Sequence, residues 1–325
     1  MNHRCSLSIV MPAYNVENYI GAALESLKNQ TESPDEIILI NDGSCDATIE
    51  VANSFSFSCP FKIVSTENKG QGPARNLGVS LSISQYIYFF DSDDILAPNF
   101  VEIIKDNIEK SVCLDILFFS GESFNDEGYQ TQREINYKRG FEGEFSSPVS
   151  IIEAAKSFNG LVCSPCLYVS KKSLWGEGRL QFKGHFLEDN ALFYPLLFSC
   201  KSIKVIDDIL FFRRNRAGST MTMKPNKKHA QGALNCLSTT INLYYEIENS
   251  YDKKKYITEK VKGFSLYYII YCRKAGEKTN FFYLLKSLKI TKSPLHGVKI
   301  LIFLFRLNES YFLKSIVKRV RAFKS

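Results

Sequence analysis

The first hundred residues alternate between short apolar runs, which predict strands, and segments with the spacing of amphipathic helices. The predicted strands occupy residues 7–11, 36–40, 61–65 and 86–90. The predicted helices occupy residues 16–30, 46–55 and a segment that begins at Pro73, a favoured first helical position. Strands and helices that alternate in this way form a doubly wound, mostly parallel sheet, so we expect an α/β fold.

The pattern is looser after residue 100. Short strands are predicted at 115–119, 161–169, 203–206 and 210–212, and an amphipathic helix at 189–198. Residues 121–148 are polar and irregular, which is typical of a mobile substrate loop. From Lys224 onward the chain has helical spacing with many lysines. We therefore expect a catalytic domain over 1–223, with halves 1–120 and 121–223, and a basic helical region over 224–325.

Charge divides the chain at the same place. Residues 1–223 contain 20 Lys and Arg against 28 Asp and Glu, a balance of −8. Residues 224–325 contain 21 against 6, a balance of +15. A basic region of this length indicates an anionic partner, either nucleic acid or lipid headgroups. No nucleic-acid recognition motif accompanies the basic residues, so we favour an anionic membrane surface and no nucleic acid.

The last residues, 299–324, predict an amphipathic helix of the kind that lies on a membrane surface. Its apolar positions, near one face, are Leu301, Phe305, Phe312, Ile316, Val320 and Phe323. Its basic positions, largely away from that face, are Lys314, Lys318, Arg319, Arg321 and Lys324. The alternative is a helix that packs on the catalytic domain with its lysines in solvent.

Composition places the chain among globular proteins, with 45% hydrophobic and 23% charged residues. Nine cysteines without regular spacing, and no signal peptide in residues 1–5, favour a reducing cytoplasm. Cys163 and Cys166 form a lone Cys-x-x-Cys pair, for which buried structural cysteines are preferred over a zinc site. No run of 18 apolar residues predicts a membrane span.

Three carboxylates follow the apolar run at 86–90: Asp91, Asp93 and Asp94. The carboxyl end of a parallel strand borders the ligand crevice of an open α/β sheet. Crowded carboxylates repel one another unless a cation or water offsets their charge. A Mg²⁺ or Mn²⁺ ion shared with substrate phosphates would do so. The alternative is an acidic turn that caps the next helix with Asp94 or Asn99.

The loops after the other strands contain groups suited to a nucleotide. Tyr14 has a ring that can stack on a base, and Asp42 can accept a base N–H. Gly70 and Gly72 allow a close backbone approach, and Arg75 supplies a fork of donors. The alternative for Arg75 is an ion pair with Asp42.

Six motifs in this order resemble the family 2 glycosyltransferases, which have the GT-A fold. They are Val10-Met-Pro-Ala-Tyr-Asn15, Ile40-Asn-Asp-Gly-Ser44, Lys69-Gly-Gln-Gly-Pro-Ala-Arg-Asn76, Phe90-Asp-Ser-Asp-Asp94, Leu187-Glu-Asp-Asn190 and Arg214-Asn-Arg-Ala-Gly-Ser219. The resemblance covers about residues 5–220, roughly two thirds of the chain. Asn41 stands where the family often has Asp, but the second acid, Asp42, is retained.

The resemblance implies a role for each matching residue. At the base of the nucleotide-sugar it would place Pro12, Ala13 and Tyr14, with Asp42 bound to uracil. Arg75 would reach the nucleotide, and Asp91 would lie near the ribose. The pyrophosphate would be bound by Arg214, Arg216 and Ser219. Asp93 would be the metal ligand, with Asp91 beside it. Glu188 and Asp189 would be the catalytic acidic pair, with Asp189 as the general base, which a helix N-terminus favours by keeping it ionised. The alternative is that Glu188 and Asp189 only cap their helix.

The implied reaction is metal-dependent transfer of a sugar, with inversion, from a UDP-sugar to a hydroxyl of a glycan or lipid-linked acceptor. It would serve surface polysaccharide synthesis at the inner face of the cell membrane. One rival is an inactive nucleotide-sugar-binding or scaffold subunit of an assembly complex. The other is a sugar nucleotidyltransferase, which would have a Gly-rich basic loop where this chain has Pro12-Ala-Tyr-Asn15.

Overall fold

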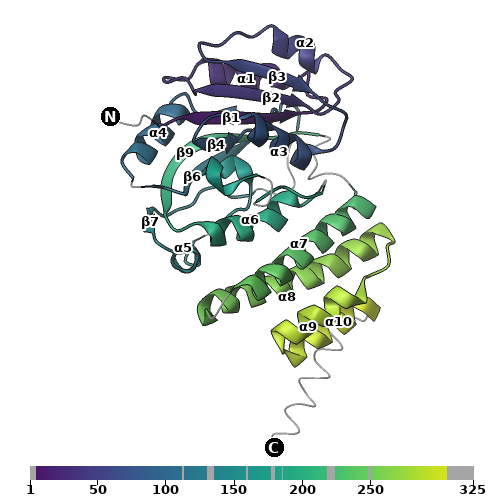
Figure 1. Ribbon diagram of the computed structural model, residues 1–325. Coiled ribbons are helices and arrows are strands. Elements are labelled where there is room, and N and C mark those ends of the chain that lie inside the picture. Colours follow the sequence, from purple (N-terminus) through teal and green to yellow (C-terminus); the bar gives the residue numbers. More distant parts are fainter. Residues whose placement is uncertain are drawn as a thin grey trace, which may run out of the picture. The chain divides into compact units, whose positions relative to one another are not determined.

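The computed structural model describes residues 5–111, 113–129, 135–158, 160–176, 180–184, 186–217, 224–247 and 250–305. The chain divides into two compact units, 1–223 and 224–325 (Figure 1). Ser219 and the residues after 305, which include most of the predicted amphipathic tail, lie outside the described residues.

The described part of the first unit is built on a nine-stranded sheet. Four of its strands pair in parallel, in the order β3-β2-β1-β4. These strands are β1 (Leu7–Ala13), β2 (Glu36–Asn41), β3 (Phe61–Ser65) and β4 (Tyr86–Phe89). The helices between them are α1 (Ile20–Lys28), α2 (Thr48–Asn53) and α3 (Gln71–Leu81). This half confirms the alternation of strands and helices that the sequence predicts.

The second half of the sheet is mixed. Its strands are β5 (Ile95–Leu96), β6 (Ile116–Asn125), β7 (Gly143–Phe145), β8 (Tyr168–Lys171) and β9 (Ile203–Asn215). Strand β8 runs antiparallel between β4 and β6, whereas β6 and β9 are parallel. Its helices are α4 (Phe100–Glu109), α5 (Pro148–Ala155) and α6 (Glu188–Ser199), with 3₁₀ turns η1 (Pro165–Leu167) and η2 (Lys172–Leu174).

Three predictions about this half were wrong in detail. Residues 203–206 and 210–212, predicted as two strands, form the single strand β9, because the polar residues between them are accommodated by register shifts against β6. The region 121–148, predicted as irregular, contains the end of β6, strand β7 and the first residue of α5. The strand predicted at 161–169 begins only at Tyr168 and follows η1.

Pro12 does not end the first strand, contrary to the prediction. Strand β1 continues to Ala13, and Pro12 pairs with Ile40 of β2. On its other side β1 pairs with β4 only as far as Val10, opposite Phe89. Because β4 has ended there, the missing N–H of Pro12 leaves no gap in that ladder.

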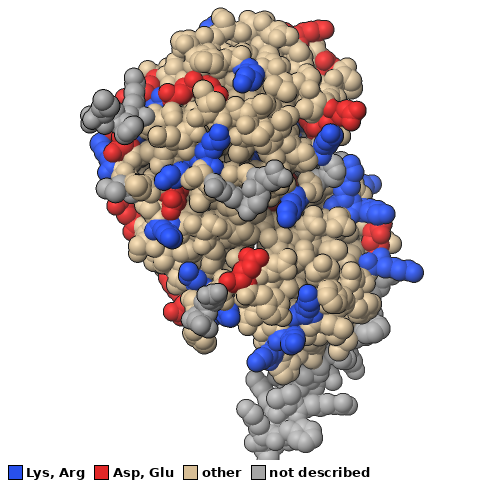
Figure 2. Space-filling view, in the orientation of Figure 1, with Lys and Arg blue, Asp and Glu red and all other residues tan. Residues whose placement is uncertain are grey.

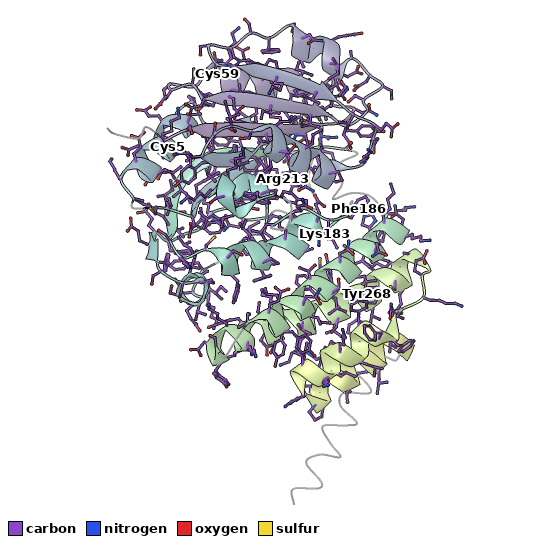
Figure 3. The ribbon with its side chains drawn as sticks, in the orientation of Figure 1. Cys5, Cys59, Lys183, Phe186, Arg213 and Tyr268 are labelled. Atoms are coloured by element: carbon purple, nitrogen blue, oxygen red, sulfur yellow. The ribbon has the colours of Figure 1, made fainter. Side chains whose placement is uncertain are left out.

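The helical unit contains α7 (Lys227–Glu246), α8 (Tyr251–Ala275), α9 (Phe281–Thr291) and α10 (Pro294–Phe305). Blue side chains outnumber red ones on the face of this unit that Figure 2 shows. Tyr268 on α8, labelled in Figure 3, accepts the N–H of Asn280, the residue that precedes α9. Among the described residues, no helix combines the length and apolar character needed to cross a bilayer.

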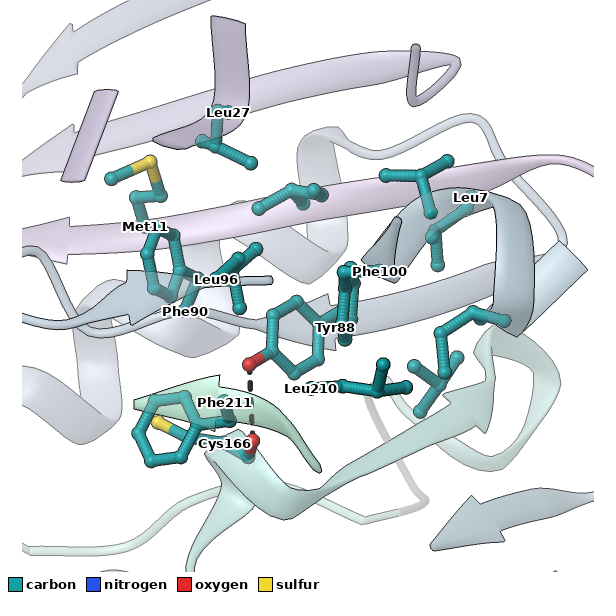
Figure 4. Packing of buried hydrophobic residues seen from close by; sticks show 14 of the residues in the cluster. Leu7, Met11, Leu27, Tyr88, Phe90, Leu96, Phe100, Cys166, Leu210 and Phe211 are labelled. Atoms are coloured by element: carbon teal, nitrogen blue, oxygen red, sulfur yellow. Dashed lines mark hydrogen bonds between the residues drawn. The ribbon is translucent and has the colours of Figure 1, made fainter. Parts of the chain in front are cut away.

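A continuous core lies between β1, β4 and the helices α1 and α4 (Figure 4). Tyr88 of β4 is fully buried, and its ring lies 4.5 Å from that of Phe100 on α4. Its hydroxyl donates to the carbonyl of Cys166 at 3.0 Å, so the polar end of this core residue is satisfied. Burying an aromatic side chain of this kind contributes about 1.5–3 kcal/mol. This packing fixes β4 and therefore the carboxylates that follow it.

Candidate active site

The carboxyl ends of β1, β2 and β4 lie at one edge of the sheet. Ala13 of β1 pairs with Asn41 of β2, and Val10 pairs with Phe89 of β4. Pro12 and Ala13 are buried at this edge, whereas the ring of Tyr14 is 49% exposed. Tyr14 is thus available for stacking with a ligand, and the two residues before it form the wall of the strand end.

Asp42 holds the loop that precedes α3. Its two carboxylate oxygens accept the backbone N–H groups of Lys69 and Gly70, each at 2.8 Å. Gly70 has φ of 95°, a conformation in which a side chain would be strained. Each carboxylate oxygen can accept a second hydrogen bond, so buried Asp42 keeps acceptor capacity for a ligand.

Arg75 joins two acidic elements that are far apart in the sequence. Its Nη2 lies 2.8 Å from Asp91 Oδ1, and its Nη1 lies 3.0 Å from Glu188 Oε1. The alternative pairing of Arg75 with Asp42 was therefore wrong. Burial acts to lower the pKa of Arg75, but the two carboxylates outweigh it and raise that pKa above its ordinary value. Arg75 remains a cation between the two acids.

Helix α3 is shaped to receive the segment that leads into α6. A Cβ atom on Gly72 would lie 3.1 Å from both the Gly184 carbonyl oxygen and Phe182 Cβ, closer than most real Cβ contacts. The side chain of Asn76 accepts the N–H of Phe182 and donates to its carbonyl, both at 2.9 Å. The Phe182 ring also lies 5.2 Å from the Arg75 guanidinium. Asn76 had no assigned role in the sequence-based interpretation. It lies four residues after Gly72 and therefore on the same helix face, which was the available signal.

The acidic pair at the start of α6 divides into a buried and an accessible carboxylate. Glu188 is 6% exposed and faces Arg75, whereas Asp189 is half-buried. Burial raises the pKa of Glu188 from 4.5 to about 7, although the Arg75 cation opposes this shift. Asp189 Oδ1 accepts the backbone and side-chain N–H groups of Asn190. The residue before the helix, Leu187, has φ of 58°.

The end of β9 closes on the acidic loop after β4. Arg216 Nε lies 2.7 Å from Asp93 Oδ2, and the Arg216 guanidinium lies 4.6 Å from the centre of the Tyr19 ring. Arg214 donates to the Asp93 carbonyl at 3.0 Å and forms an ion pair with Asp126 at 2.9 Å. Both arginines thus lie at the acidic loop, but they are paired with carboxylates. Ser219, the third member of this motif, lies outside the described residues.

Asp94 is buried and structural rather than a cap of α4. Its Oδ1 accepts the backbone N–H of Arg214 at 2.8 Å, which fastens β9 to the acidic loop. Asn99 occupies the N-cap position of α4 but makes no side-chain capping bond. Neither candidate of the capping alternative therefore acts as a cap.

The neighbouring Arg213 is partly buried. Arg213, which is labelled in Figure 3, donates to the Tyr137 hydroxyl, and its guanidinium lies 5.6 Å from the centre of the Tyr137 ring.

Two sets of groups near the acidic loop could hold a metal ion. Ligand atoms of Asp91, Asp94 and Cys166 lie within 4.8 Å of one another. Burial raises the pKa of Asp94 and of the Cys166 thiol well above their ordinary values, which disfavours their anionic forms, and a thiol is in any case a poor ligand for a hard cation. Asp91 and Asp93 fit better: each uses one oxygen for an arginine, and the other oxygen accepts no hydrogen bond from a described residue.

Comparisons with known proteins bear on the family and the fold of the chain. Residues 8–205 match the family model described as glycosyl transferase family 2, as the resemblance predicted. Glycosyltransferase GlyG of Streptococcus pneumoniae serotype 4 is 26% identical over 253 residues, which cover 73% of this chain and 79% of GlyG. Chondroitin synthase of Escherichia coli is 36% identical over 132 residues, which cover 40% of this chain and 19% of that protein.

Relatives with 33–38% identity are matched over less than half of their own length.

A solved structure with the same fold is S. aureus TarS 1-349 in complex with UDP-GlcNAc. Its TM-score is 0.67 at 17% identity, and the match covers 95% of this chain and 92% of TarS 1-349. The similarity confirms the predicted α/β fold of GT-A type with C-terminal helices.

Proposed function

The chain belongs to glycosyl transferase family 2, and from this premise we propose that it is an active enzyme of that class. It transfers a sugar from a nucleotide-sugar donor, a UDP-sugar, to a hydroxyl of a glycan or lipid-linked acceptor. The catalytic unit is 1–223, with the donor half at 1–120 and the acceptor half at 121–223. The reaction belongs to EC 2.4 and serves surface polysaccharide synthesis. Relatives named for chondroitin synthesis and for minor teichoic acid biosynthesis support this context.

The observation that carries the proposal is the position of Arg75 between Asp91 and Glu188. One guanidinium group contacts both carboxylates, so the acidic loop of the donor half and the acidic pair of α6 border the same site. An inverting glycosyltransferase needs this juxtaposition, because the leaving diphosphate and the attacking hydroxyl must lie on opposite sides of one sugar carbon. Two acidic elements in separate parts of the fold would not support this chemistry.

The donor occupies the edge formed by β1, β2 and the loop before α3. Tyr14 stacks on the base beside Pro12 and Ala13, and Asp42 accepts its imide N–H. Arg75 keeps Asp91 oriented toward the ribose. Arg216 and Arg214 meet the pyrophosphate, with Ser219 in the same motif, since guanidinium forks bind phosphate oxygens in pairs.

Asp189 receives the proton of the acceptor hydroxyl as the oxygen attacks the anomeric carbon, and the bond to the diphosphate breaks. A single displacement of this kind inverts the anomeric centre. Glu188 is unsuited to be the base because it is buried against Arg75, so it positions the start of α6. Asp93 and Asp91 would hold Mn²⁺ or Mg²⁺, which when bound neutralises charge on the leaving diphosphate.

The C-terminal region 224–325 is proposed to bring the enzyme to an anionic membrane at the cytoplasmic face of the cell, next to a lipid-linked acceptor. Its net charge of +15 supports this placement. A nucleotidyltransferase is disfavoured because the segment after β1 is Pro12-Ala-Tyr-Asn15, without a Gly-rich basic loop. An inactive subunit would not need the accessible carboxylate of Asp189.

The test is a screen of UDP-sugars against soluble glycan and polyprenyl-linked acceptors, with Mn²⁺ or Mg²⁺, using the full chain and its Asp189→Asn and Asp93→Ala variants. We expect product with the wild-type chain, loss of transfer but retained UDP binding in Asp189→Asn, and weaker metal-dependent UDP binding in Asp93→Ala. An active Asp189→Asn enzyme would remove Asp189 as the base. Binding of UDP-sugars without transfer to any acceptor would favour the inactive subunit.

A further inference from the structure

Helix α9 has large apolar side chains on two opposite faces. Leu284 and Ile290 are buried, at 2% and 7% exposure. Phe281, Phe282 and Leu285 are 59%, 57% and 65% exposed. At 100° per residue these three positions fall within about 100° of one another, on the side away from the buried residues. Single exposed apolar residues are common, but three adjacent large ones on one short helix indicate a contact surface.

The exposed face is held in place by the rest of the helical unit. Asn280 caps α9 by accepting the N–H of Phe282 at 3.1 Å, and its own N–H donates to Tyr268 on α8 at 2.8 Å. The buried side of α9 packs against α8. The apolar side chains are therefore presented by an anchored helix and not by a frayed end.

Basic side chains surround this apolar face. Residues 271–305 contain seven Lys and Arg but only one acid, Glu277. Lys278, Lys289 and Lys292 are exposed, and Lys286 Nζ lies 4.4 Å from the centre of the Phe282 ring. Long lysine stems can lie along an apolar surface while their ammonium groups reach outward. Aromatic and aliphatic residues rimmed by lysine are the pattern of a helix that lies in a membrane interface.

We propose that α9 docks on an anionic phospholipid bilayer, with Phe281, Phe282 and Leu285 among the upper acyl chains and Lys278, Lys289 and Lys292 at the headgroups. This inference rests on the proposed function and deepens it, because it identifies the part of the chain that meets the membrane. A second copy of the chain fits less well. A symmetric contact would bring two copies of the same basic segment together, with Glu277 as its only acid.

The experiment measures sedimentation of the full chain with vesicles of phosphatidylcholine, alone or with roughly 30% phosphatidylglycerol. We expect binding to the anionic vesicles that weakens as salt is raised from about 0.1 to about 0.5 M. The triple variant Phe281→Ser, Phe282→Ser, Leu285→Ser should lose at least about tenfold in vesicle affinity. The triple variant Lys278→Glu, Lys289→Glu, Lys292→Glu should lose the preference for anionic lipid.

Two controls separate this face from general surface effects. Ile83→Ser removes an apolar side chain of 85% exposure from the other unit, and Lys28→Glu with Lys62→Glu reverses two exposed lysines there. Both should bind vesicles as the wild-type chain does. The inference is overturned if the apolar triple variant binds anionic vesicles as tightly as the wild-type chain does, or if the wild-type chain does not bind anionic vesicles. A third outcome would also overturn the inference: the wild-type chain forms a dimer and binds no vesicles, and the apolar triple variant is monomeric.

UDP binding and transfer to a soluble acceptor are measured on the same proteins. We expect both to be unchanged in the α9 variants, because these residues lie outside the donor and acceptor elements. A wild-type chain that binds vesicles but not UDP would defeat the proposed function and leave the α9 inference standing. A wild-type chain that binds UDP but not vesicles would defeat only the α9 inference.

Discussion

Arg75 and Glu188 form a buried ion pair, with 3.0 Å between Nη1 and Oε1, although 113 positions separate them in the sequence. The same guanidinium holds Asp91 at 2.8 Å, so it connects α3, the loop after β4 and the start of α6. Removing one partner of a buried pair leaves an uncompensated charge, which costs more than the pair itself contributes. In the proposed mechanism, this relationship keeps the donor and acceptor halves of the site aligned.

Replacing Arg75 by Lys should damage transfer more than folding. Lysine offers a point charge that can meet one carboxylate, but it lacks the planar fork that bridges two. We expect kcat to fall by about a hundredfold, because Asp91 or Glu188 loses its partner. Steady-state kinetics and urea unfolding provide the measurement. Arg273→Lys, at a guanidinium that donates to the Phe303 carbonyl, is the control and should keep normal kcat. Normal transfer by Arg75→Lys would contradict the bridging role.

The contribution of Glu188 to the stability of the metal-free protein should fall as pH rises from about 4.5 to about 7. Burial raises the pKa of Glu188 from 4.5 to about 7, so in this window the folded protein binds more protons than the unfolded chain. The stabilisation from the protonated carboxyl is complete below pH 4.5 and is lost as pH passes 7. The contribution is up to about 3 kcal/mol.

Urea unfolding of the wild-type chain and of Glu188→Gln at several pH values tests this prediction. The free energy of unfolding should fall less steeply with pH in Glu188→Gln than in the wild type. Glu153→Gln alters an exposed ion pair with Lys156 and should leave the decrease in place. A Glu188→Gln profile that parallels the wild-type profile would show that other groups cause the decrease.

Gly72→Ala should lower both stability and activity. The added methyl group would press on the Gly184 carbonyl and Phe182 at 3.1 Å and on Glu188 Cγ at 3.3 Å. We expect a loss of about 1–3 kcal/mol and a reduced kcat, because Glu188 must shift away from Arg75. Gly263→Ala in α8, where a Cβ meets nothing within 4 Å, should instead stabilise by about 0.5–1 kcal/mol. Equal effects of the two substitutions in urea unfolding would refute the packing argument.

Asp42→Asn should weaken UDP binding. Lys69 and Gly70 donate to different oxygens of Asp42, and in Asn one of these positions is an NH₂ donor. One backbone N–H therefore loses its partner at a cost of about 1–3 kcal/mol. The loop before α3 then loses its fixed position, and calorimetry should show at least about tenfold weaker UDP binding. Asp35→Asn removes a carboxylate that accepts from Leu7 and pairs with Lys105, so it should reduce stability but spare UDP affinity. Wild-type UDP affinity in Asp42→Asn would exclude this role.

The sequence predicted which loops meet at the sheet edge that is proposed to bind the donor, because strand ends are local features. An apolar run ending in polar residues marks the end of a buried strand, and parallel strands end at the same edge. Tyr14, Asp42 and Asp91 could therefore be grouped before the structure was known. Asp94 could not be separated from Asp91 and Asp93 in this way, because its burial depends on a hydrogen bond to Arg214, 120 positions away.

The sequence by itself determined the order of strands and helices in the first hundred residues, the family resemblance and the basic character of the last hundred. These properties follow from neighbouring residues and from composition. Only the tertiary structure decided that Arg75 pairs with Asp91 and Glu188 instead of Asp42, that Asn76 holds Phe182, and that Glu188 is buried while Asp189 is accessible. The physical reason is that burial and ion pairing depend on distances between segments far apart in the chain, which no local pattern specifies.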